Sequence, residues 1–156
     1  MSENQEEYIQ SFQAESKKSG GHFEDIVMSE LHINGYQDIK KNVYVYEAGV
    51  EVDFLADGHY IEAKGGYEGD KKRPGAKRTD SVKKAIANGA LIKATIPNAH
   101  YKVYFSSKPI PGSSSDIMIN VALEHKIIDA VIYIEQEVEL FDQLIGTLDF
   151  DSWEQN

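Results

Sequence analysis

Hydrophobic and polar residues alternate with a period of two in two short runs that flank Asp57-Gly58. An Asp-Gly pair between such runs is a strong signal for a two-residue hairpin turn, because both positions tolerate a positive φ. Residues 50–66 are therefore predicted to form a β-hairpin in which Asp53 lies opposite Glu62. Because side chains alternate between the two faces of a strand, one face is apolar and the other polar. The apolar face is expected to carry Val52, Phe54, Ile61 and Ala63, and the polar face Asp53, Glu62 and Lys64.

The chain before the hairpin is predicted to hold one helix and one strand. A hydrophobic period of 3.6 residues predicts a helix over residues 22–34, which Gly35 would end. Glu24 and Glu30 both fall within its apolar arc, where an acid needs a partner or a metal. Alternation of apolar residues and tyrosines predicts a strand over residues 42–48.

The chain after the hairpin is predicted to alternate between helices and strands. Residues 67–78 are rich in Gly, Lys and Arg and are typical of a loop. A helix follows, capped by Thr79 or Asp80. Its packing stripe is Val82, Ala85, Ile86, Gly89 and Ala90, while Lys83, Lys84 and Asn88 face away. Then come a strand over residues 101–105, a helix from Ser114 or Ser115 to about Lys126, and a strand over residues 130–134. In that last helix the residues spaced to pack are Ile117, Val121, Ala122 and His125.

This order predicts an α/β fold with a mixed central sheet flanked by helices. The length favours a single domain over residues 1–156, with a core over about residues 20–135. An acidic arm over residues 1–18 and an acidic segment over residues 135–156 lie outside this core. Tyr8 and Phe12 lie four residues apart, which allows a short amphipathic helix in the arm, with a loose arm as the alternative. The acidic segment has room for one more helix, over Leu140 to Ile145.

Composition narrows the class of protein. The chain has no cysteine, which excludes disulfides and thiolate metal sites. No apolar run is long enough to span a membrane, and the N-terminus lacks the pattern of a signal peptide. We therefore expect a cytoplasmic protein with no membrane partner. A small organic cofactor is not expected either.

Charge is distributed unevenly along the chain. The net charge is −10, yet residues 65–102 hold nine bases against three acids, and residues 135–156 hold seven acids and no base. A basic segment directly after the polar strand fits a phosphodiester substrate; a solvated lysine-rich loop is the alternative. The candidate phosphate contacts are Lys71, Lys72, Arg73, Lys77, Arg78, Lys83 and Lys84.

The polar face of the hairpin carries the candidate chemistry. Like charges directly opposed across two strands are destabilising. A chain that places Asp53 opposite Glu62 is therefore expected to use the pair of acids. Two carboxylates at that separation suit a hard divalent cation, whose oxygen ligands lie at about 2.0–2.1 Å for Mg²⁺. Lys64 adds a cation that can stabilise a transition state. The alternative is an exposed sheet face on which these residues form a salt bridge.

These residues resemble the motif of the PD-(D/E)XK nuclease superfamily. Asp53 is followed after eight residues by Glu62-Ala63-Lys64, and the first helix opens with Gly20-Gly21-His22-Phe23-Glu24, which looks like the superfamily's Gly-x-x-Phe-Glu. The order of elements is similar to its restriction-endonuclease-like αβββαβ core, over about residues 20–135. Val52 stands where the family's name expects proline.

The resemblance implies roles for these positions. Asp53, Glu62 and the backbone carbonyl of Ala63 would hold one or two Mg²⁺ ions, for which Mn²⁺ would substitute. Glu24 would complete the ligand set directly or through water, with Glu30 as the alternative. Lys64 would orient or deprotonate the attacking water.

The expected function is therefore that of a magnesium-dependent endonuclease acting on DNA, with RNA left open as the target. Cleavage of both strands would favour a homodimer. A junction resolvase, a restriction or homing enzyme and a phage-type nuclease are the candidate subtypes. The alternative is a noncatalytic module that keeps the nuclease fold and binds nucleic acid or a protein.

Overall fold

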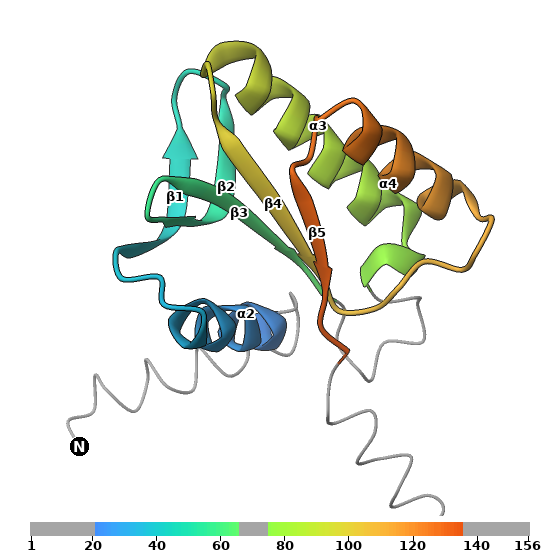
Figure 1. The fold of residues 1–156 in the computed structure, drawn as a ribbon, viewed down its shortest axis with the longest axis horizontal. Helices are drawn as coiled ribbons and strands as arrows, with labels where there is room; N and C mark the ends of the chain where they lie inside the picture. The colour runs from blue at the N-terminus through green and yellow to red at the C-terminus, as the bar shows by residue number, and fades with distance from the viewer. Residues whose placement is uncertain (1–20, 66–74, 136–156) are drawn as a thin grey trace, which may run out of the picture.

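The computed structural model describes residues 21–65 and 75–135 of the chain (Figure 1). In chain order the elements are α2 (Gly21–Ile33), β1 (Ile39–Val45), β2 (Val50–Ala56), β3 (His59–Lys64), η1 (Gly75–Lys77), α3 (Thr79–Thr95), β4 (His100–Phe105), α4 (Ser114–Glu124) and β5 (Ala130–Tyr133). The predicted order of helix, three strands, helix, strand, helix and strand is confirmed.

The strands form one mixed sheet in the order β1-β2-β3-β4-β5. Strand β2 pairs antiparallel with β1 and with β3, whereas β4 pairs parallel with β3 and with β5. Parallel neighbours need a crossover connection, and α3 and α4 supply the two that this sheet requires. The predicted α/β class is confirmed.

The helices lie on both faces of the sheet (Figure 1). On one face, α2 buries Phe23, Val27 and Leu31 against Phe54 and Ile61 of the hairpin. The other face is covered by α3 and α4. Its buried cluster includes Val52, Val82, Ala85, Ile92, Tyr101, Val103, Phe105, Ile119 and Ala122. The hairpin therefore lies between α2 on one side and α3 on the other.

Strand β2 changes face at Asp53. Val52 packs in the cluster under α3, whereas Phe54 packs under α2, so the prediction that they share a face was wrong. The cause lies in β1, where Asn42 has a φ of 53°. Its neighbours Lys41 and Val43 pair with Phe54 and Val52. A left-handed residue breaks the regular alternation of a strand pair, and this places Asp53 at the crossing between the two faces.

Other boundaries differ from the predicted ones. The strand expected over residues 42–48 ends at Val45, because residues 46–49 turn, with Gly49 at a φ of 70°. Helix α3 has Arg78 as its N-cap with no side-chain capping bond, and Ser113 caps α4 by accepting a hydrogen bond from the Asp116 N–H at 3.3 Å.

Some predicted packing positions are also wrong, and two predicted helices fall outside the described residues. Ala90 and His125 are exposed rather than packed. The helices expected near Tyr8 and over Leu140 to Ile145 lie outside the described residues. Within residues 21–65 and 75–135, no helix is both long and apolar enough to cross a membrane.

Candidate active site

The hairpin forms as predicted around Asp57 and Gly58, whose φ values are 48° and 82°. Pairing runs from Ala56–His59 to Phe54–Ile61, in the predicted register. The Asp57 carboxylate accepts hydrogen bonds from the backbone N–H groups of Gln37, at 3.0 Å, and Asp38, at 2.8 Å. These bonds tie the turn to the segment before β1 and fix the hairpin in place.

Asp53 follows the last of these pairs and bonds across the hairpin with its side chain. Its Oδ2 accepts a hydrogen bond from the backbone N–H of Ala63 at 2.7 Å. A hydrogen bond that a backbone N–H donates to a carboxylate is strong because the acceptor is charged. It holds the Asp53 carboxylate against β3 directly beside Glu62.

Glu62 is buried, with 2% of its surface exposed. Asn88 Nδ2 on α3 donates to its Oε1 at 3.1 Å, and Lys64 Nζ lies 3.3 Å from its Oε2. Burial and then the charge of Asp53 raise the pKa of Glu62 to about 8, and Lys64 and Asn88 oppose this rise only in part. Near neutral pH this carboxyl group is therefore close to its own titration point.

Glu24, in the first turn of α2, is the third acid of the group. Burial raises its pKa to about 7, followed by the charge of Asp53 and a side-chain hydrogen bond with it. Glu30 acts instead on Tyr104, whose pKa rises through burial and through the charges of Tyr36 and Glu30. Of the two acids left open by the sequence, Glu24 is thus the one that interacts with Asp53.

Gly65 allows α2 to approach the end of β3 closely enough for this contact. A Cβ atom at Gly65 would lie 2.4 Å from the Cβ of Phe23, which is a severe clash with a buried side chain. Phe23 directly precedes Glu24 in the helix. The absence of a side chain after Lys64 therefore helps to bring Glu24 to Asp53.

The donor set fits Mg²⁺ in its chemistry. Across residues 21–65 and 75–135, no three His, Asp or Glu side chains already stand in metal-binding geometry. However, Mg²⁺ keeps several waters and is commonly bound through one or two carboxylates together with substrate phosphates. Asp53 and Glu62 supply such a pair, and a divalent cation would remove the repulsion that raises the pKa of Glu62.

The candidate phosphate contacts that the structure describes lie at the start of α3. Lys77 in η1 is exposed, as are Lys83 and Lys84 on α3, and Arg78 is half-buried at the helix N-cap. Lys71, Lys72 and Arg73 lie outside the described residues. The described bases and Asn88 therefore share one helix and the short turn before it.

Asn88 is the site residue that sequence reasoning missed. The predicted packing stripe placed it on the outer side of α3, yet it bonds to Glu62. At about 100° per residue, Asn88 lies roughly 40–60° from Ile92 and Ala85 around the helix. Both of these residues are buried. This angle would have placed Asn88 at the margin of the buried face.

No family model matches the chain, and no curated protein or solved structure is significantly similar to it. The function must therefore be inferred from the geometry of the site.

Proposed function

We propose that the chain is a metal-dependent endonuclease that hydrolyses DNA phosphodiester bonds on a restriction-endonuclease-like core. The observation that supports this best is the position of Asp53 between two acids with raised pKa values, Glu24 and Glu62, with Lys64 on the same strand as Glu62. An arrangement that costs stability in the folded protein and couples several titrating groups is typical of functional sites.

The proposed ligands for Mg²⁺, or for Mn²⁺ in its place, are Asp53, Glu62 and the backbone carbonyl of Ala63, with Glu24 bound directly or through water. When bound, such an ion lowers the pKa of a coordinated water and neutralises charge that develops on the phosphate. Lys64 orients the attacking water or accepts its proton. Glu62 holds Lys64 in place, because Lys64 Nζ lies 3.3 Å from Oε2.

The bases at the start of α3 would bind the nucleic-acid backbone. Lys77, Arg78, Lys83 and Lys84 give affinity and position rather than sequence preference. A single site of this kind cuts one strand, so cleavage of both strands calls for two copies of the chain.

Cleavage assays with two matched lysine variants test this proposal. Wild type, Lys64→Ala and Lys93→Ala are incubated with supercoiled plasmid, linear duplex and a four-way junction, in Mg²⁺, Mn²⁺ or EDTA. Lys93 is the control because it also pairs with an acid, Asp129, outside the candidate site. We expect metal-dependent cleavage that Lys64→Ala lowers by roughly a hundredfold or more, the usual scale for loss of a general acid or base.

Two outcomes would contradict the proposal. If Lys64→Ala cleaves as fast as Lys93→Ala, Lys64 has no role in the reaction. If cleavage persists unchanged in EDTA, the metal dependence is wrong.

A noncatalytic binding module is the second candidate, and the bonding of Glu62 favours it. Both oxygens of Glu62 already have protein partners, as expected of a purely structural network.

The effect of Mg²⁺ on the melting temperature distinguishes the nuclease from the binding module. A ligand at 100 times its Kd stabilises the protein by about 2.7 kcal/mol. A nuclease site should give a shift that Asp53→Asn removes and Asp129→Asn retains, whereas a structural network should give no shift.

A further inference from the structure

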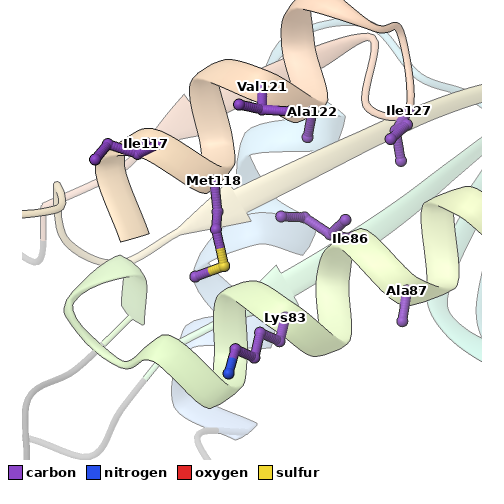
Figure 2. Close-up of a pocket in the computed structure, with 8 residues that line it drawn as sticks. All are labelled: Lys83, Ile86, Ala87, Ile117, Met118, Val121, Ala122 and Ile127. Carbon is purple, nitrogen blue, oxygen red and sulfur yellow. The ribbon is translucent and has the colours of Figure 1, made fainter. Parts of the chain in front are cut away.

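Helices α3 and α4 leave an apolar pocket between them (Figure 2). Its volume is about 350 Å³. Ile86 on α3 and Ile117, Met118 and Val121 on α4 line it together with Ile127. Lys83 supplies the charged group at its edge.

The apolar lining continues onto an exposed surface. Hydrophobic spacing predicted that Ile117 and Val121 would pack in the core, but they are 57% and 46% exposed, and the residues of α4 that are buried are Ser115, Ile119 and Ala122. Exposed apolar residues that surround a pocket mark an interaction site. The helix therefore has two apolar faces, one against the sheet and one available for a partner.

Residues 136–156 have the sequence pattern of a segment that binds an apolar surface. Leu140, Leu144, Ile145 and Leu148 recur at the spacing of one helical face. The same residues 136–156 include six acids and no base. An amphipathic helix of this kind is a common occupant of an apolar groove.

Charge is complementary between this segment and the α3 side of the groove. Lys83 borders the pocket, and Lys84 next to it is exposed. Acids on the polar face of the segment would therefore meet lysines rather than open solvent. Such contacts set the orientation and the partner more than they set the affinity.

The described part of the chain also ends near the first turn of α4. Strand β5 ends at Tyr133, whose pKa is raised by burial and then by the charge of Asp116 in the first turn of α4. Ile117 follows Asp116 directly in that turn. A helix rises about 1.5 Å per residue, so the 21 residues after Glu135 are long enough to run beside the 11-residue α4.

We propose that residues 136–156 dock as an amphipathic helix in the groove between α3 and α4 of the same chain, with their acids over Lys83 and Lys84. This inference does not depend on the proposed nuclease activity. It has a consequence for that activity, since a docked segment would compete with nucleic acid for the same two lysines.

Cross-linking in the full-length chain tests the occupant directly. The chain has no cysteine, so two cysteines can be introduced cleanly, Val121→Cys in the groove and Leu144→Cys in the segment. The control pair keeps Leu144→Cys and adds Ile33→Cys, at a 77% exposed position at the end of α2, the helix on the opposite face of the sheet. Tethering gives effective concentrations in the millimolar range. We therefore expect the groove pair to react with a short bismaleimide within one chain roughly tenfold faster than the control pair.

The other outcomes overturn the proposal. A cross-link between two chains would make a second copy the occupant of the groove. Equal rates for the two pairs would mean that the segment does not dock.

Tryptophan fluorescence gives an independent measurement. The single tryptophan of the chain, Trp153, is replaced by phenylalanine, and Leu144→Trp places the probe on the apolar face of the proposed helix. Adding Val121→Glu, which places an acid in the groove, should shift the emission to longer wavelength, whereas adding Ile33→Glu should leave it unchanged. An identical spectrum with and without Val121→Glu would contradict docking.

Discussion

Two lysine–acid pairs in this protein have the same chemistry, but the pKa of the acid is shifted in opposite directions in the two pairs. Lys93 pairs with Asp129, which also accepts a hydrogen bond from the Tyr101 N–H at 2.8 Å. Burial acts to raise the pKa of Asp129, but the bonds from Lys93 and Tyr101 outweigh it and the pKa is lowered. Lys64 pairs with Glu62, which likewise has an amide donor, yet the pKa of Glu62 is raised to about 8.

The difference comes from burial and from the other carboxylates. Glu62 is 2% exposed and has Asp53 beside it, whereas the Asp129 side chain keeps 23% of its surface in solvent. A lysine partner is therefore not enough to make the charged form of an acid favourable in the folded protein. The Lys93–Asp129 pair is a structural contact, whereas the raised pKa of Glu62 indicates that its charge is unfavourable in the folded state.

Removing the charge of Glu62 and removing the charge of Asp129 should change the free energy of unfolding in opposite directions. This is the largest effect that we expect. In metal-free buffer at pH 8, Glu62→Gln should stabilise the protein by roughly 1–3 kcal/mol, because it removes a buried charge beside Asp53 and keeps an acceptor for Asn88. Asp129→Asn should destabilise it by up to about 1 kcal/mol, the value of a partly exposed pair. Urea unfolding at equilibrium measures both changes.

The activity of these two variants sharpens the contrast. Glu62→Gln should lose metal-dependent cleavage while it gains stability, and Asp129→Asn should keep cleavage. A Glu62→Gln variant that is less stable than wild type would show that the ion pair with Lys64 outweighs the repulsion from Asp53.

The pH dependence of stability should reveal the same acids. The pKa values of Glu24 and Glu62 in the folded state, about 7 and about 8, both exceed their ordinary value of 4.5. Between pH 4.5 and 8 the folded state therefore binds more protons than the unfolded state, and stability falls as pH rises. The slope reaches at most about 1.4 kcal/mol per pH unit for Glu62, and it is smaller for Glu24, which is only half-buried.

Thermal unfolding in EDTA across this range measures the slope. Glu62→Gln should remove most of it. Asp129→Asn should leave it intact, because the lowered pKa of Asp129 places its own titration at lower pH. A flat profile for wild type would mean that the acids do not interact in solution.

Local patterns were enough to predict the elements that carry the site. The Asp57-Gly58 turn determines the hairpin register through Phe54 and Ile61, because turn geometry sets which residues pair. The period of the first helix predicted its bounds within one or two residues. The α/β class follows from this order of elements.

Contacts between distant elements could not be predicted in the same way. The change of face at Asp53 depends on the left-handed backbone of Asn42 in the neighbouring strand. The interaction of Asp53 with Glu24 depends on how closely α2 approaches Gly65. The exposure of Ile117 and Val121 arises because α4 turns Ile119 and Ala122 toward the sheet instead. In each case the deciding interaction joins residues far apart in the chain.

Asn88 offers the most sensitive test of the comparison between the two pairs. Its bond to Glu62 Oε1 favours the charged carboxylate, so Asn88→Ala should raise the pKa of Glu62 further. Because a ligating carboxylate must be ionised, the pH at which Mg²⁺ begins to stabilise the protein should move upward. Mg²⁺ affinity near pH 7 should fall by roughly tenfold, the usual effect of losing a hydrogen bond to a metal ligand, which Glu62 is proposed to be. Asn120→Ala, on the exposed side of α4, is the matched control and should bind Mg²⁺ like wild type. If Asn88→Ala lowers the affinity equally at all pH values, Asn88 acts by shaping the site and not by setting the charge of Glu62.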